Sequence, residues 1–348
     1  MSASSTALAF STDVVKSFKP SKLLNYHKDR KQITSIDFDD TGAYCITSAE
    51  DESIQLYDAK LGKHSKSIQS KKYGASLVRF THHATNCIYA STKEDDTIRY
   101  LSLHDNKYIR YFKGHKATVD ALEVSPLNDV FLSASSDNSI RLWDLRSSTC
   151  QGFMRTVAPS FLAFDPTAVL FSIGSEVASE VALYDVRNFD KQPFSTFKIP
   201  RSSRPGPPAA WDKIEFSNTG KLILIGTDGD THYLLDSFTG ELKAKLVGHT
   251  SFTNANRNAD GSPRKRATGH ISFTADGRFV FAGSPDKKIF IWDTSRIDSL
   301  PDNDLSLHPI KILDSQAPTS LLAFNPSFML LATADVALTF WLPEMKPE

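Results

Sequence analysis

The stretch from residue 96 to residue 144 constrains the fold of this chain more than any other part of the sequence. It contains a Gly114-His115 pair and ends on Trp143-Asp144. Apolar and polar residues alternate in four short segments separated by turn residues, which predicts β-strands. We place these strands at residues 108–112, 119–124, 130–134 and 139–143. Four short strands bury too little apolar surface to be stable alone, so the unit must pack against copies of itself.

Copies of this unit follow one another along the whole chain. The seven closing positions are Tyr57-Asp58, Leu101-Ser102, Trp143-Asp144, Tyr184-Asp185, Leu235-Asp236, Trp292-Asp293 and Trp341-Leu342. The first of these recur at the period of about 40–45 residues that is typical of WD40 repeats, and Gly-His with Trp-Asp is the WD40 signature. Longer intervals later in the chain predict insertions at residues 200–210 and 250–268. We therefore predict an all-β, seven-bladed WD40 β-propeller.

The two ends of the sequence predict how the ring closes. The last repeat stops at Trp341-Leu342-Pro343, directly after its third strand, so its blade lacks an outer strand. An unpaired strand edge is a liability in a β-protein. Residues 22–26 occupy the place before the first repeat that residues 108–112 occupy before the third. We predict that residues 22–26 complete blade 7, with residues 1–21 as an N-terminal segment and residues 22–348 as the propeller.

The spacing within the third repeat predicts a hydrogen-bonded tetrad. His115, Asp137, Trp143 and either Ser133 or Ser135 can meet, because a buried indole N–H needs an acceptor and a carboxylate can accept from the imidazole. We assign these residues a structural role. No nucleophile elbow accompanies them, and no paired cysteines have metal-ligand spacing, so we expect no catalytic residue, metal or cofactor.

Composition narrows the class of partner. The chain has 40 basic and 40 acidic residues and a formal net charge of zero, which argues against general or sequence-specific nucleic-acid binding. Its three cysteines are too few for a disulfide framework and favour a reducing compartment. We find no signal peptide and no transmembrane segment, and expect no membrane partner.

Basic residues gather in the loops that open blades 1 to 3. The candidate partner-binding residues are Lys28, Arg30, Lys71, Lys72, Tyr73, Lys113 and Lys116. Lysine and arginine there can donate charge-assisted hydrogen bonds to an acidic or phosphorylated peptide. Acidic residues lie in neighbouring turns of the same face, so an ordinary solvated rim of mixed charge is the alternative interpretation.

Several segments are more specific than the repeat itself. They are residues 70–74 (SKKYG), 95–115 (DDTIRYLSLHDNKYIRYFKGH), 139–152 (SIRLWDLRSSTCQG), 188–199 (NFDKQPFSTFKI) and 340–343 (FWLP). Across residues 14–348 the chain resembles the small WD-repeat subunit shared by the COMPASS histone H3 lysine 4 methyltransferase complex and the cleavage and polyadenylation factor with its protein phosphatase 1 module. The insertion at residues 250–268 is longer and more basic than this resemblance predicts.

The resemblance implies a nuclear, non-catalytic adaptor. Its expected partners are the N-terminal region of a SET-domain histone methyltransferase, subunits of the cleavage and polyadenylation factor and phosphatase module, and the phosphorylated tail of RNA polymerase II. It implies roles in transcription termination and mRNA 3′-end processing. Two alternatives stay open: a substrate receptor of a ubiquitin ligase, and a propeller enzyme with an acid–base pair or metal at the channel mouth.

Overall fold

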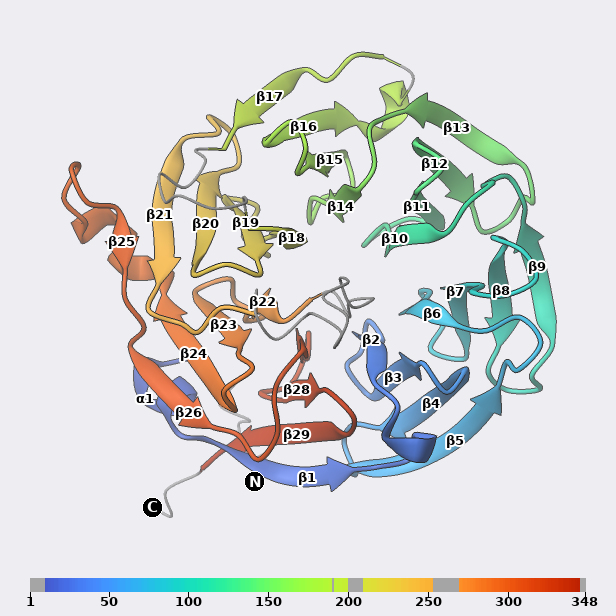
Figure 1. Ribbon diagram of the computed structural model, residues 1–348, viewed down its shortest axis with the longest axis horizontal. Helices are drawn as coiled ribbons and strands as arrows, with labels where there is room; N and C mark the ends of the chain where they lie inside the picture. The colour runs from blue at the N-terminus through green and yellow to red at the C-terminus, as the bar shows by residue number, and fades with distance from the viewer. Residues whose placement is uncertain (1–9, 190, 200–208, 253–268, 345–348) are drawn as a thin grey trace, which may run out of the picture.

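The computed structural model describes residues 10–189, 191–199, 209–252 and 269–344. These residues form seven antiparallel sheets arranged as blades around a ring, so the predicted all-β, seven-bladed propeller is confirmed (Figure 1). Each of the seven closing positions lies at or next to the end of the third strand of a blade. Over the described residues, no helix is both long and apolar enough to span a bilayer.

Blades 1 to 3 follow one pattern of four strands numbered from the channel outward. Blade 1 consists of β2 (Ile33–Phe38), β3 (Tyr44–Ala49), β4 (Ser53–Asp58) and β5 (Lys63–Gln69). Blade 2 consists of β6 (Ser76–Phe80), β7 (Asn86–Ala90), β8 (Ile98–Ser102) and β9 (Tyr108–Phe112). Blade 3 consists of β10 (Val119–Val124), β11 (Val130–Ser135), β12 (Ser139–Asp144) and β13 (Cys150–Arg155).

Blades 4 to 6 keep the pattern with additions. Blade 4 consists of β14 (Ser160–Phe164), β15 (Leu170–Ser175), β16 (Glu180–Asp185) and β17 (Ser195–Lys198), with the 3-10 helix η2 (Val186–Asn188) before β17. Blade 5 consists of β18 (Trp211–Phe216), β19 (Leu222–Thr227), β20 (Thr231–Asp236) and β21 (Leu242–Val247). Blade 6 consists of β22 (Ile271–Phe273), β23 (Phe279–Gly283), β24 (Lys288–Asp293) and β26 (Lys311–Asp314).

Blade 5 carries a fifth strand that belongs to the chain of blade 6. The 3-10 helix η3 (Thr294–Ser299) and β25 (Ser306–Leu307) follow β24, and β25 pairs in parallel with β21. This excursion, before the chain returns to β26, accounts for part of the long interval between the last two repeats. Most of the predicted insertions at residues 200–210 and 250–268 lies outside the described residues.

Blade 7 joins the two ends of the chain. Its inner strands are β27 (Leu321–Phe324), β28 (Leu331–Ala334) and β29 (Leu338–Pro343), and its outer strand is β1 (Phe18–Leu24). In Figure 1, β1 and β29 run side by side, and their register places Phe18 opposite Pro343 and Leu24 opposite Leu338. The predicted closure by an N-terminal strand is therefore confirmed.

The bounds predicted for that strand, residues 22–26, are wrong. The strand starts at Phe18, which is buried, and ends at Leu24. Pro20 and a register shift between Pro20 and Lys22 interrupt the alternation of apolar and polar residues by which a strand is recognised in a sequence. The segment assigned to residues 1–21 also contains α1 (Thr12–Lys16), whose Val15 packs into the apolar cluster shared by blades 6 and 7.

The core lies between the blades. One cluster joins Ile88 and Ile98 of blade 2 to Phe131 and Trp143 of blade 3. The opposite face of blade 3 packs in a separate cluster with blade 4, where Leu132 and Leu142 meet Phe171. The second and third strands of blade 3 therefore bury side chains on both faces, as expected for sheets packed face to face.

Candidate functional site: the loop face of blades 1 to 3

The order of strands places two kinds of loop at the same end of every blade. Strands alternate in direction, so the loop entering the first strand and the turn between the second and third strands share one face, which we call the entry face. The turns between strands one and two, and between strands three and four, lie on the opposite face, called the exit face. All seven candidate partner-binding residues lie in loops of the entry face.

In blade 3 the structure brings the predicted tetrad together. Ser133 Oγ accepts from Trp143 Nε1 at 2.9 Å and lies 2.7 Å from His115 Nε2. The other ring nitrogen, Nδ1, is 3.1 Å from Asp137 Oδ2. The geometry is satisfied when Ser133 donates to Nε2 and Nδ1–H donates to the carboxylate. Of the two serines that the sequence left open, Ser133 fills the place.

Ser135 has a different function beside the tetrad. Its hydroxyl donates to the carbonyl oxygen of Ala117 at 2.8 Å and accepts from the backbone N–H of Asp137 at 3.1 Å. These contacts fix the turn that carries the carboxylate. Ser139 donates to the same carboxylate at 2.5 Å.

The charges of this tetrad follow from its burial and its donors. Burial lowers the pKa of His115, and Asp137 offsets this only in part, so the imidazole is neutral at neutral pH. Burial on its own raises the pKa of Asp137. Hydrogen bonds from Ser139, the N–H of Lys116 and His115 outweigh burial and lower that pKa to about 2. A neutral imidazole held by a carboxylate and a serine resembles a catalytic triad in composition, but here the serine is buried and accepts from an indole.

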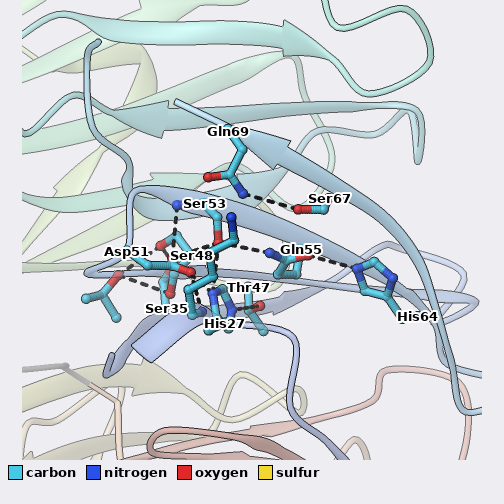
Figure 2. Close-up of polar contacts among 12 residues, drawn as sticks. His27, Ser35, Thr47, Ser48, Asp51, Ser53, Gln55, His64, Ser67 and Gln69 are labelled. Atoms are coloured by element: carbon cyan, nitrogen blue, oxygen red, sulfur yellow. Dashed lines mark hydrogen bonds and ion pairs between the residues drawn. The ribbon is translucent and has the colours of Figure 1, made fainter. Parts of the chain in front are cut away.

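Blade 1 contains a second tetrad that the sequence analysis missed. Figure 2 shows His27 between the hydroxyls of Thr47 and Ser53. Its Nε2 lies 2.9 Å from the Thr47 hydroxyl, and its Nδ1 lies 3.0 Å from the Ser53 hydroxyl and 3.2 Å from Asp51 Oδ1. Hydrogen bonds from His27, Ser53 and the backbone of Lys28 outweigh burial and hold the pKa of Asp51 well below its usual range. The sequence does indicate this tetrad, since Asp51 precedes Tyr57 by six residues, the same spacing that separates Asp137 from Trp143.

This network extends across the blade. Gln55 donates to Ser53 at 2.9 Å, and Nε2 of His64 on the outer strand lies 2.8 Å from the side-chain Oε1 of Gln55 (Figure 2). Ser35 shares a 2.6 Å hydrogen bond with Ser48 and accepts from the backbone N–H of Val78 in blade 2. Hydrogen bonds of polar side chains in blade 1 therefore reach its outer strand through His64 and the neighbouring blade through Ser35.

Blade 2 replaces the tetrad with an arginine cluster. The guanidinium of Arg99, only 3% exposed, lies 3.5 Å from the centre of the Tyr73 ring. Its Nε donates to Ser91 at 2.8 Å, and one terminal nitrogen contacts both oxygens of Asp95 at 2.9 and 3.0 Å. Tyr73 precedes Leu101 by the same number of residues that separate His115 from Trp143. The aromatic ring predicted to face a partner is thus half-buried and stacked on Arg99.

The other six candidates are exposed on the entry face. They are Lys28, Arg30, Lys71, Lys72, Lys113 and Lys116. Four acidic residues of this face have partners of their own: Asp51 with His27, Glu52 with Lys93, Asp95 with Arg99, and Asp137 with His115. No ion pair within the described part of the chain joins any of the six cations to a carboxylate. The face can therefore present basic charge although the chain is neutral.

The channel behind this face has a different character. Arg79 and Glu123 form an ion pair at 3.0 Å inside it, and burial raises the pKa of Asp37 to about 7. Acidic residues outnumber basic ones in the lining of this channel, where Arg79 and Lys213 are the basic residues among those described, so an anion finds no excess of donors there. Among the described residues, no group of three or more His, Cys, Asp or Glu side chains is placed to hold a metal ion.

Comparison with known proteins places this architecture in a family. Residues 18–58, 106–144 and 263–293 match the model described as WD domain, G-beta repeat. The chain is 41% identical to WD repeat-containing protein 82 of Drosophila melanogaster, with 95% of this chain and 96% of the relative covered. It is 36% identical to the Set1 complex component swd2 of Schizosaccharomyces pombe, with 97% and 99% covered. It is also 36% identical to the COMPASS component SWD2 of Saccharomyces cerevisiae, with 94% of each covered. The chain belongs to the family of these WD-repeat proteins.

The matched segments agree with the local geometry. Two of them contain the tetrads built on His27 and His115, and the third ends at Trp292-Asp293. The segment that forms most of blade 2, where Tyr73 and Arg99 replace the tetrad, lies outside the match. Blade 2 of this chain therefore departs from the general repeat.

Proposed function

We propose that this protein is a non-catalytic scaffold subunit of the COMPASS histone H3 lysine 4 methyltransferase complex and acts in the nucleus. The observation that carries the proposal is similarity over nearly the whole chain to two relatives named as components of the Set1 complex and of COMPASS. The histidine, serine and aspartate side chains that could suggest catalysis are occupied in the two tetrads.

The proposal includes a second assignment in mRNA 3′-end processing and transcription termination. The partners proposed are the N-terminal region of the SET-domain methyltransferase, the cleavage and polyadenylation factor with protein phosphatase 1, and the phosphorylated tail of RNA polymerase II. Exposed cations on the entry face support an acidic or phosphorylated ligand, because four of the neighbouring carboxylates are already paired.

Affinity purification of the tagged protein from nuclear extract tests the scaffold assignment. The expected result is copurification of methyltransferase subunits and of polyadenylation subunits. Recovery of ubiquitin-ligase adaptors in place of both would contradict it and favour the substrate-receptor alternative.

Charge reversal tests the entry face as the docking surface. The variant Lys71→Glu, Lys72→Glu, Lys116→Glu should bind the methyltransferase N-terminal region and phosphorylated polymerase-tail peptides at least tenfold more weakly, about 1.4 kcal/mol. Wild-type affinity should fall as salt rises. Single substitutions should have small effects, since an exposed pair contributes about 0–1 kcal/mol.

A matched control reverses three exposed lysines at the other end of the strands. These are Lys107, Lys221 and Lys311, and the variant has the same net charge as the test variant. It should bind as the wild type does. If the entry-face variant keeps its circular dichroism spectrum and its partners at wild-type affinity, the docking site lies elsewhere.

A further inference from the structure

An apolar groove opens on the exit face where blades 7 and 1 meet. Its cavity volume is about 420 Å³, within the range of about 300–1,000 Å³ that is typical of ligand pockets. Two turns form its walls: the turn between β27 and β28, which carries Phe328, and the turn between β4 and β5, which carries Leu61. The groove is therefore built from both ends of the chain and faces away from the basic entry face.

The floor and the rim of this groove differ in exposure. Ala59, Leu330 and Phe340 form a buried floor. Leu61, Phe328 and Leu342 form the rim, with 63%, 39% and 45% of their surface exposed. Isolated exposed apolar side chains are ordinary, but three around one hollow with an apolar floor indicate an interaction site.

The charges at the rim have one sign. Lys22 and Lys60 are the charged members of the described lining, and no acidic residue lines the groove within the described part of the chain. The Lys60 ammonium lies 5.2 Å from the centre of the Phe328 ring, which holds the cation at the rim. The stem of Lys22 lies against Gly62 of the opposite turn, close enough that a Cβ there would meet Lys22 Cγ at 3.1 Å. Both cations are thus placed beside the apolar hollow.

We propose that this groove binds a linear peptide segment of a partner protein, with one or two bulky apolar side chains in the hollow and acidic residues beside them. The apolar floor and rim take the anchor side chains, and Lys22 and Lys60 select the flanking carboxylates. The volume fits anchors of a peptide rather than a folded domain. Because the ligand contacts blade 7 and blade 1 together, its binding also stabilises the closure of the ring.

This site is independent of the entry face. The two surfaces lie at opposite ends of the strands, so one protein can hold two partner segments at once. The entry-face variant Lys71→Glu, Lys72→Glu, Lys116→Glu should bind the groove peptide with unchanged affinity. A failure of either proposal therefore leaves the other standing.

A phage-displayed library of random 12-residue peptides, panned on the full-length chain, supplies the probe. Enriched peptides should share a Leu, Met, Phe or Trp anchor with Asp or Glu within three positions. The best peptide, made synthetically with a fluorescent label, should bind in a polarisation titration and raise the melting temperature of the chain. Absence of enrichment, or a basic consensus, overturns the proposal.

Substitutions then locate the binding. Leu61→Asp should weaken binding of the labelled peptide at least tenfold, as should Lys22→Glu combined with Lys60→Glu. Leu127→Asp is the matched control, because Leu127 is 65% exposed in a turn of the same face in blade 3, outside the groove. Equal affinity of Leu61→Asp and wild type, or equal loss in Leu127→Asp, contradicts the site.

Two other occupants give distinct outcomes. If residues 345–348 of this chain filled the groove, their deletion would strengthen peptide binding several-fold, and the groove would be self-occupied. If a second copy filled it, sedimentation would show a dimer that Leu61→Asp dissociates. Either result overturns the proposal of a partner peptide, and a monomer with unchanged affinity after the deletion supports it.

Discussion

Blades 3 and 6 carry the same signature residues and use them differently. Both have Gly-His before the first strand and Trp-Asp at the end of the third, with an aspartate six residues before the tryptophan. In blade 3 the histidine, serine, aspartate and tryptophan form one network. In blade 6, His249 stacks on His232 at 4.0 Å, and Trp292 donates to the backbone carbonyl of Val247.

One side chain contributes to the difference. The residue ten positions before the tryptophan is Ser133 in blade 3 and Ala282 in blade 6. Without a hydroxyl there, the indole and the imidazole have no common partner. Asp286 instead accepts from Thr250 and Ser284, and His249 Nε2 lies 3.0 Å from the Gly229 carbonyl oxygen. The signature residues at the ends of a repeat therefore do not determine the network inside it.

The largest effect should come from removing the indole of blade 3. Trp143→Ala should cost about 3–5 kcal/mol of unfolding free energy, because the side chain is fully buried. The substitution also leaves Ser133 without its donor. Urea denaturation followed by intrinsic fluorescence of the remaining tryptophans measures the loss. A loss below about 1 kcal/mol would mean that the tetrad does not hold the blade.

Removing the serine hydroxyl should have the second-largest effect on stability, and this effect should be specific to blade 3. Ser133→Ala should cost about 1–3 kcal/mol, since it leaves a buried indole N–H and an imidazole nitrogen without partners. The substitution recreates in blade 3 the composition of blade 6. Its control is Ser135→Ala, which spares the indole and the imidazole. If Ser135→Ala cost more than Ser133→Ala, the assignment of the two serines would be reversed.

The smallest expected effect is on the stability of the fold at low pH. The pKa of Asp137 falls to about 2 in the folded chain from about 3.9 when unfolded, so its contribution is complete above about pH 5 and lost as pH falls toward 2. Asp137→Asn should lower the melting temperature at pH 7 and flatten its decline below pH 5. Asp286→Asn should change this acid limb less, because Asp286 accepts from two hydroxyls and lacks the imidazole donor that Asp137 has in addition to Ser139. Equal slopes for both variants would remove the distinction between the blades.

The sequence predicts the ring well because the repeat imposes it. Strand alternation with a regular closing residue determines the seven blades, and a missing outer strand determines the closure. The details that escaped prediction depend on contacts between segments far apart in the chain. Ser133 and Ser135 point to the same face of their strand, and only the register along that strand places Ser133 beside the indole. Pro20 and its bulge hid the start of β1, so the strand was placed too late.

The candidate site is predictable in its charges and not in its aromatic residue. Lysines and arginines in loops are exposed almost wherever the loops go. Tyr73 is different, because its environment depends on Arg99, which lies on a strand of the same blade and needs Asp95 to balance its charge. The groove at Leu61 and Phe328 could not be found from the sequence, since it joins turns from opposite ends of the chain.

The closure of blade 7 has a consequence for the order of synthesis on the ribosome. β1 is among the first strands to be made, and its partner β29 is the last. About 300 residues separate them, so at roughly 5–20 residues per second β1 waits on the order of 15–60 s for its partner. During that time β1, whose Phe18 and Leu24 are buried in the finished ring, has no strand to pair with. A chain that stalls before residue 338 therefore holds six blades and an unpaired first strand, and only the final residues make the circle.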